Sequence, residues 1–281
     1  MNKVVSASRR TDLLAFFPEW LSGVLRKGRA DVLGPSGRTY SVDLNPESVH
    51  TFVLWSKNFQ NLISNRFGLE RLLAEYEQIY CHFTITGLGG TFIERGVPTA
   101  DEALDQLEPL IRISGHPERV TIRFDPVVFW KEKSEVRTNL GFLEKMAPRI
   151  RGLGVKHIRF SFAQWYRKAK RRAEKHEFVF LDYPEEEMRR AALTLAGVAL
   201  KYGLNLDACS QSFLSDIEGI QPSSCIDGRL LQRLHPQNAP VSFTKDKSQR
   251  KDCRCTESVD IGSYTQSCPH ACLYCYANPR I

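Results

Sequence analysis

The chain has 281 residues, a length that allows one large α/β domain or two small ones. Its residues are 42% hydrophobic and 25% charged, which is the composition of an ordinary globular protein. The longest weakly polar run, residues 191–200, is too short to cross a bilayer, which excludes a membrane-spanning helix there. The first ten residues also lack the apolar stretch of a signal peptide, so we expect a cytoplasmic protein with no membrane partner.

The net charge of +7 and the isoelectric point near 9.0 are mildly basic. Such a balance favours an anionic partner, for example nucleic acid. Much of the charge falls in one stretch, residues 167–175. We favour a solvated helix face or a loop for this stretch, and binding of an anion is the alternative.

Short apolar runs rich in β-branched residues predict six strands. They lie at residues 4–8, 51–56, 79–86, 120–124, 157–162 and 204–208. Helical patterns separate several of these runs. Thr99 and Glu102 form a capping-box pattern at the start of one helix, and residues 140–150 repeat an apolar face at helical spacing. A third helix is expected after Pro184, where three glutamates follow, and Gly203 can end it.

Strands that alternate with helices predict parallel βα units. About six such units would form a (β/α) barrel or a partial barrel, and an open doubly wound sheet is the alternative fold. After about residue 210 the periodicity fades, and Pro, Gly, Ser and Cys become frequent. We therefore predict an α/β body over residues 1–210 and a cysteine-rich, metal-binding segment over residues 211–281 that packs over the barrel mouth.

Polar residues at the ends of predicted strands are the candidate catalytic or substrate-binding groups, because βα barrels place their active sites at the carboxyl ends of strands. The candidates are Arg9, Arg10, Asp12, Lys57, Arg123 and Asp125. The cations suit a carboxylate or a phosphate, and the aspartates could balance charge or bind an amine or a ribose. Arg123 and Asp125 alternate along one strand and share a face, where a charged pair needs partners. Each residue could instead serve as a cap, a turn residue or half of an internal ion pair, and Asp12 in particular could cap the next segment.

Three cysteines near the C-terminus, Cys268, Cys272 and Cys275, follow a C-x3-C-x2-C spacing, and Tyr274 precedes the third. Eight cysteines in a reducing compartment indicate metal binding rather than disulfides, and five of the eight lie at residues 253–275. Three close thiolates can hold three irons of a 4Fe–4S cubane and leave the fourth iron open to a small molecule. The spacing therefore predicts an iron–sulfur cluster on these three cysteines.

A second metal site is predicted from four other cysteines. Cys253 and Cys255 lie just upstream of the terminal motif, and Cys209 and Cys225 are the two nearest remaining thiols. Together they could bind a second iron–sulfur cluster or a tetrahedral zinc ion. In the alternative readings, Cys209 and Cys225 are ordinary free cysteines, or a single zinc site draws on the cysteines of the whole tail. Cys81 remains as a plain buried thiol.

Several segments resemble a bacterial family described as domain of unknown function 1848. The segments that carry this resemblance span nearly the whole chain and lie at residues 6–12, 53–58, 123–126, 161–166, 225–228, 253–255, 258–264 and 268–275. The family's description assigns no function, and its C-terminal cysteines have been likened to the cluster motif of radical S-adenosylmethionine enzymes. The resemblance therefore implies a cofactor but not a substrate.

The terminal motif also fits the C-x3-C-x-aromatic-C pattern of radical S-adenosylmethionine enzymes. Residues 268–278 resemble the cluster loop of spore photoproduct lyase and related DNA-repair-type radical enzymes. This resemblance implies a 4Fe–4S cluster on Cys268, Cys272 and Cys275 whose open iron chelates S-adenosylmethionine, with Tyr274 beside the adenine. In such enzymes the cluster loop usually follows the first strand, whereas here it would return over the barrel mouth from the C-terminus. Residues 9–12 are then the nearest counterpart of the usual loop position.

The leading hypothesis is a radical S-adenosylmethionine-type enzyme that forms a 5′-deoxyadenosyl radical and abstracts hydrogen from a small-molecule or nucleic-acid substrate. Its implied partner is an electron donor such as a flavodoxin or a ferredoxin. The second hypothesis is a zinc-stabilised protein that binds nucleic acid through its basic run and has no redox chemistry. The third is an iron–sulfur enzyme whose open iron acts without S-adenosylmethionine, as a Lewis acid or a sulfur carrier. The open-iron spacing favours the first and third hypotheses over the second.

Overall fold

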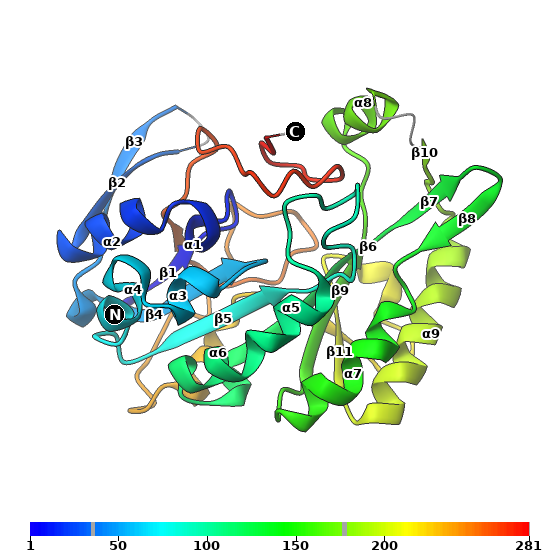
Figure 1. The fold of residues 1–281 in the computed structure, drawn as a ribbon. Coiled ribbons are helices and arrows are strands. Elements are labelled where there is room, and N and C mark those ends of the chain that lie inside the picture. Colours follow the sequence, from blue (N-terminus) through cyan, green and yellow to red (C-terminus); the bar gives the residue numbers. More distant parts are fainter. Residues whose placement is uncertain (35–36, 176–178, 281) are drawn as a thin grey trace.

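One sheet of parallel strands organises the protein. In the computed structural model, which describes residues 1–34, 37–175 and 179–280, eight strands pair in the order β12-β11-β9-β6-β5-β4-β1-β13 (Figure 1). Every neighbouring pair is parallel. The strands are β1 (Lys3–Ala7), β4 (Val49–Ser56), β5 (Ile79–Thr84), β6 (Val120–Val127), β9 (His157–Phe162), β11 (Asn205–Cys209), β12 (Ile220–Ser223) and β13 (Val259–Asp260).

All six predicted strands are present, as β1, β4, β5, β6, β9 and β11, and the α/β class with a large parallel sheet is confirmed. The sheet does not close. It ends at β12 and β13, and no backbone pairing joins these two edges within the described residues. A closed barrel, one of the two forms that we predicted, is therefore wrong. The edge strands hold four and two residues, so they offer few backbone groups to a closing ladder.

Both edge strands come from the segment after residue 210. β12 pairs with β11, and β13 pairs with β1 at the opposite edge. Neither strand was predicted, because β13 is too short to show alternation and β12 contains Pro222, which cannot donate to a ladder. The body and the segment that we predicted along the chain thus share one sheet.

Five more strands form two small antiparallel sheets that were not predicted. β2 (Arg29–Leu33) pairs with β3 (Thr39–Asp43). β7 (Phe129–Glu132) pairs with β8 (Glu135–Thr138) and with β10 (Val179–Phe180). The second of these sheets extends away from the end of β6, beside α8 (Figure 1).

Helices α5, α6, α7 and α9 pack on one face of the large sheet (Figure 1). None of the described helices is both long enough and apolar enough to cross a bilayer. The α-helices are α1 (Leu13–Phe16), α2 (Pro18–Arg26), α3 (Gln60–Ile63), α4 (Leu69–Leu73), α5 (Ala100–Asp105), α6 (Leu107–Ser114), α7 (Phe142–Gly152), α8 (Arg167–Lys175), α9 (Glu185–Tyr202) and α10 (Gly228–Leu234). Short 3-10 helices lie at Pro46–Ser48, Arg66–Gly68, Pro117–Arg119 and Ser212–Leu214.

The three predicted helical regions are present, and their end signals work as expected. The capping box at α5 is complete: Thr99 Oγ1 accepts from the N–H of Glu102 at 3.3 Å, and the Glu102 carboxylate accepts from the N–H of Thr99 at 2.8 Å. A break at Gln106 divides this region into α5 and α6. α9 follows Pro184 and ends at Gly203, whose φ of 63° lies in the left-handed region that glycine adopts readily.

Replacing Thr99 with alanine is expected to lower the free energy of unfolding by about 1 kcal/mol, because the first turn of α5 loses its capping oxygen. Urea unfolding followed by circular dichroism measures this change. Thr194, exposed within α9, provides the control. Alanine is the better helix former there, so Thr194→Ala is expected to stay within about 0.5 kcal/mol of the wild type. Equal losses in the two variants would argue against the capping role.

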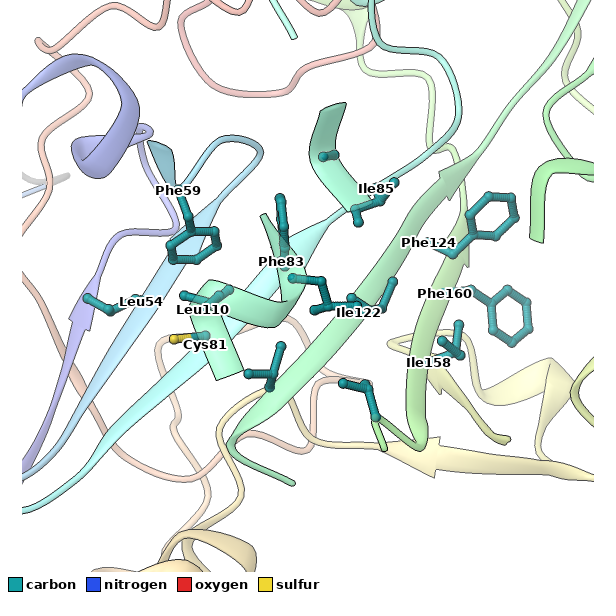
Figure 2. Packing of buried hydrophobic residues seen from close by; sticks show 14 of the residues in the cluster. Leu54, Phe59, Cys81, Phe83, Ile85, Leu110, Ile122, Phe124, Ile158 and Phe160 are labelled. Carbon is teal, nitrogen blue, oxygen red and sulfur yellow. The ribbon is translucent and has the colours of Figure 1, made fainter. Parts of the chain in front are cut away.

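The two faces of the large sheet differ in chemistry, because side chains alternate along each strand. The face toward the helices is apolar, with Leu54, Phe83 and Phe124 fully buried in one core (Figure 2). The opposite face, which we call the polar face, carries His82, Arg123, Arg159 and Asp207. Part of the C-terminal segment packs against this polar face, through the buried side chains of Cys225, Ile226, Leu231, Val241, Cys253 and Cys255.

Candidate functional site

The C-terminal cysteine loop, residues 268–275, lies by the carboxyl ends of the central strands (red in Figure 1). It pairs with the loop between β5 and α5. Leu273 donates its backbone N–H to Ile93 at 3.0 Å, and Gly96 donates to His270 at 3.1 Å. Glu94 and Cys272 also form an antiparallel bridge. The backbone of the cysteine loop is therefore held by a connection that follows a central strand.

A buried contact fixes the cysteine loop to the residues after β1. His270 Nε2 lies 2.8 Å from Asp12 Oδ2, and His270 Nδ1 lies 2.9 Å from the carbonyl oxygen of Gly96. The His270 ring therefore bridges the Asp12 carboxylate and the backbone of the loop between β5 and α5. Asp12 also accepts from the Ser56 hydroxyl and caps α1. The candidate Asp12 is thus the helix cap that we considered and, in addition, an anchor of the loop.

The three cysteines of the loop differ in exposure: Cys272 is buried, and Cys268 and Cys275 are partly exposed. Burial raises the pKa of all three thiols, to about 12 for Cys268. Without a metal these sulfurs are therefore protonated at neutral pH. Among the described residues, no three His, Cys, Asp or Glu side chains surround a common point as the ligands of a single metal ion do.

A charged pair, in which Glu94 is buried and Lys57 is partly exposed, lies beside the cysteines. Lys57 Nζ is 2.9 Å from Glu94 Oε1, and the Tyr274 hydroxyl donates to the same carboxylate. Glu94 is fully buried, and its Oε2 finds no hydrogen-bond partner among the described residues. Burial acts to lower the pKa of Lys57, but Glu94 raises it above its usual value, so the ammonium stays charged. The predicted site residues Lys57 and Tyr274 therefore both donate to the carboxylate of Glu94. Glu94 itself was not predicted as a site residue.

The basic stretch at residues 167–175 is the helix α8, and it packs beside the cysteine loop. Arg172 Nε donates to the carbonyl of Leu273 at 3.2 Å, and the same guanidinium donates to the carbonyl of Cys275. The other cations of α8 are exposed; they are Arg167, Lys168, Lys170, Arg171 and Lys175. One arginine of the stretch thus orders the loop, and the rest form the solvated face that we favoured.

Replacing Arg172 with alanine is expected to speed backbone hydrogen exchange in residues 268–277 by about tenfold. The reason is that two loop carbonyls lose a charged donor, a loss of about 1.5–3 kcal/mol per bond that water partly offsets. Exchange followed by mass spectrometry measures the change. Arg171→Ala, an exposed position on the same helix, is the matched control and is expected to leave the loop unchanged. Equal protection of the loop in the two variants would contradict the contact.

Arg9 and Arg10 follow β1 and have different surroundings. Arg10 donates to the carbonyl of Gly262 at 2.8 Å and to the Tyr40 hydroxyl at 3.2 Å. Its guanidinium joins the first strand to the segment after β13, which is a structural use. Arg9 lies over the Trp55 ring, with Cζ 5.2 Å from the ring centroid, and its Nη2 has no hydrogen-bond partner in the described part of the chain. Arg9 therefore keeps a donor for a ligand.

Arg123 and Asp125 interact at the end of β6, as their alternation predicts. Arg123 donates to one carboxylate oxygen of Asp125, and the Ser161 hydroxyl of β9 donates to the other. Arg123 also lies 5.0 Å from the centroid of the Trp55 ring, so this ring contacts two arginines. Its Nε is buried without a hydrogen-bond partner among the described residues. Arg123 and Asp125 thus have hydrogen-bond partners, as a charged pair at this position requires. Arg123 Nε remains available as a second donor, in addition to Arg9 Nη2.

The other four candidate ligands come together on the polar face. Cys209 Sγ lies 3.5 Å from Cys225 Sγ, and the thiol of Cys255 hydrogen-bonds with those of Cys225 and Cys253. All four are buried. Cys81 lies in the core under the helices, and burial raises its pKa, which fits a plain buried thiol. The structure therefore places these four cysteines in one group and leaves Cys81 apart.

A comparison with known families agrees with the residue pattern. A family model described as Domain of unknown function (DUF1848) matches residues 4–277. The chain belongs to the DUF1848 family. No curated protein matches it. The family description names no activity, so the function has to be argued from the geometry of the site.

Four residues of this region were not predicted as site residues: Glu94, His270, Arg172 and Asp260. Glu94 lies in a glycine-rich loop without periodicity, which gives no sign of burial. His270 occupies an unspecified position between two motif cysteines, and only its place in the motif could have drawn notice. Asp260 accepts from the hydroxyls of Ser6 and Ser8 and from a backbone N–H, and it was visible only within a segment of family resemblance.

Proposed function

We propose that this protein is an iron–sulfur enzyme of the radical S-adenosylmethionine type. Cys268, Cys272 and Cys275 would hold a 4Fe–4S cluster and leave one iron for S-adenosylmethionine. Under reduction these cofactors supply a 5′-deoxyadenosyl radical for hydrogen abstraction. The observation that carries the proposal is the position of the three-cysteine loop by the carboxyl ends of parallel strands, which is where βα proteins place their active sites.

The surroundings of the three thiols fit such a cluster. A cubane bonds each thiolate to a different iron, so its cysteines do not converge on one point as the ligands of a single ion do. Burial raises the pKa of Cys275, but Arg172 and Lys57 act in the opposite direction and favour its thiolate. The unpartnered Oε2 of Glu94 is an acceptor for an ammonium group, such as that of S-adenosylmethionine. Tyr274 and Lys57 both donate to the other oxygen of this carboxylate, Oε1.

The substrate would meet the cations that the site leaves available. Arg9 Nη2 and Arg123 Nε are buried donors without hydrogen-bond partners among the described residues, and both guanidiniums are held over Trp55. They suit a carboxylate or phosphate group on a small molecule or a nucleic acid. Arg10 drops out of this role, because Gly262 and Tyr40 already engage its guanidinium. We also propose that the open sheet is a partial (β/α) barrel, which is a common fold of such enzymes.

Cleavage of S-adenosylmethionine tests the proposal. Protein purified without oxygen is incubated with dithionite and S-adenosylmethionine, and 5′-deoxyadenosine and methionine are measured by mass spectrometry. The expected result is release of both products above a control without protein. A protein that holds about four iron and four sulfide in the terminal loop but releases neither would contradict the proposal and favour an open-iron enzyme without S-adenosylmethionine. Zinc without sulfide would favour the nucleic-acid-binding alternative.

A further inference from the structure

Four thiols outside the cysteine loop form a buried chain of contacts on the polar face. Cys209 ends β11, and Cys225 follows β12; their sulfurs are 3.5 Å apart. Cys253 and Cys255 belong to the same buried cluster as Cys209 and Cys225. The backbone N–H of Ile226 lies 3.4 Å from Cys255 Sγ. Three separate segments of the chain thus meet through these sulfurs.

Cations surround this group of four thiols. Arg159 is 3% exposed and donates to the carbonyl of Cys225 at 3.1 Å, and its Nε lies 3.8 Å from Asp207 Oδ2. Arg9 presents its unpartnered Nη2 near the same cysteines. Arg9 Nη1 also donates to the hydroxyl of Ser258, three residues after Cys255, at 3.2 Å. Asp207 offsets part of the charge of Arg159, and metal-bound thiolates beside this buried cation would offset more of it.

We propose that Cys209, Cys225, Cys253 and Cys255 form a second metal centre, in which four thiolates hold a thiophilic metal, either a zinc ion or a 4Fe–4S cluster. Both occupants have four thiolate ligands and leave the same net charge of about −2. Arg159, which already contacts the Cys225 carbonyl, would offset part of that charge. The inference does not depend on S-adenosylmethionine chemistry and goes beyond the function proposed above.

Binding at this centre replaces one set of bonds by another. In the described structure all four thiols are free, and the sulfurs of Cys209 and Cys225 are in contact. Among the described residues, the sulfurs are not arranged around one point as the ligands of a single ion are. On metal binding each remaining S–H bond breaks, its proton leaves to solvent, and the sulfur forms a bond to the metal. Binding of a zinc ion, or transfer of a preformed 4Fe–4S cluster, requires no change of oxidation state.

Metal analysis of a variant without the terminal motif tests the inference. Cys268, Cys272 and Cys275 are together replaced by alanine, and the protein is purified without oxygen from cells supplied with iron and zinc. The expected content is about four iron with four sulfide, or about one zinc, per chain. Adding Cys253→Ala to this variant is expected to lower the metal content at least about fivefold. Adding Cys81→Ala is the matched control and is expected to change nothing, since Cys81 lies on the other face.

The reciprocal variant covers the case in which the first does not fold. Cys253→Ala with Cys255→Ala keeps the terminal motif, and it is expected to lose the zinc, or about half of the iron, of the wild type. Metal-free protein from the terminal-motif variant, with wild-type circular dichroism, would overturn the inference. So would unchanged metal in the reciprocal variant. If the metal is retained but the wild type does not cleave S-adenosylmethionine, the proposed function fails and this inference stands.

Discussion

Replacing Glu94 with alanine is expected to lower the free energy of unfolding by about 3–5 kcal/mol. Glu94 is fully buried, and its carboxylate lies 2.9 Å from the Lys57 ammonium. Without it, a cation remains buried with no counter-charge in contact, and the Tyr274 hydroxyl loses its acceptor. Equilibrium urea unfolding measures the loss, and the same variant is expected to expose the cysteine loop to protease, because Tyr274 belongs to that loop.

Two controls separate the effect of the buried charge from that of a lost ion pair. Adding Lys57→Met to Glu94→Ala removes the stranded ammonium and is expected to restore more than about half of the lost stability. Lys201 and Glu144 form an exposed pair at 2.7 Å. Glu144→Ala is expected to cost less than about 1 kcal/mol, because water screens that pair. If Glu94→Ala lowers the free energy of unfolding no more than Glu144→Ala does, burial of the Glu94–Lys57 pair does not account for the stability of this region.

Replacing Cys272 with alanine is expected to remove about nine tenths or more of the cluster in the terminal loop, and with it the release of 5′-deoxyadenosine. A cubane that keeps one open iron has only three protein ligands, so the loss of one leaves two irons without a thiolate. Cys272 is also the buried member of the set, beside the charged Lys57. The measurements are the intensity of the reduced-cluster electron paramagnetic resonance signal and product release.

The matched control for Cys272 is Cys81, which is also buried and also replaced by alanine. Cys81→Ala is expected to keep both the cluster signal and the cleavage, because this thiol packs in the core under the helices. An intact cluster in Cys272→Ala would contradict the assignment of the three ligands. Loss of the signal in both variants would point to a stability effect of any buried cysteine change.

The large sheet was predictable because its strands are buried on both faces or carry clear apolar runs. β4 is buried along its whole length, and β5 nearly so. Such runs stand out from the helices between them. The edges could not be predicted: β13 is two residues long, and β12 contains Pro222, which cannot donate to a ladder. The register of β13 beside β1 depends on tertiary contacts, among them the bonds from Ser6 and Ser8 to Asp260.

The parts of the candidate site that depend on residues close together in the sequence were predictable. The pair Arg123 and Asp125 follows from alternation along a strand, and the cysteine motif follows from its spacing. The partners that organise the site lie far away in the chain, and their roles depend on folding. Asp12 and His270 are 258 residues apart, so no local pattern could relate them. Glu94 shows its importance only through burial, which a loop sequence does not reveal.

Iron, zinc and sulfide content of protein purified without oxygen, followed by electron paramagnetic resonance after reduction, tests the central claim most directly. The account predicts iron with matching sulfide, and a reduced-cluster signal that changes when S-adenosylmethionine is added. That change would mean that the cofactor reaches an open iron. Zinc without sulfide, or a cluster signal that S-adenosylmethionine leaves unchanged, would contradict the proposed function.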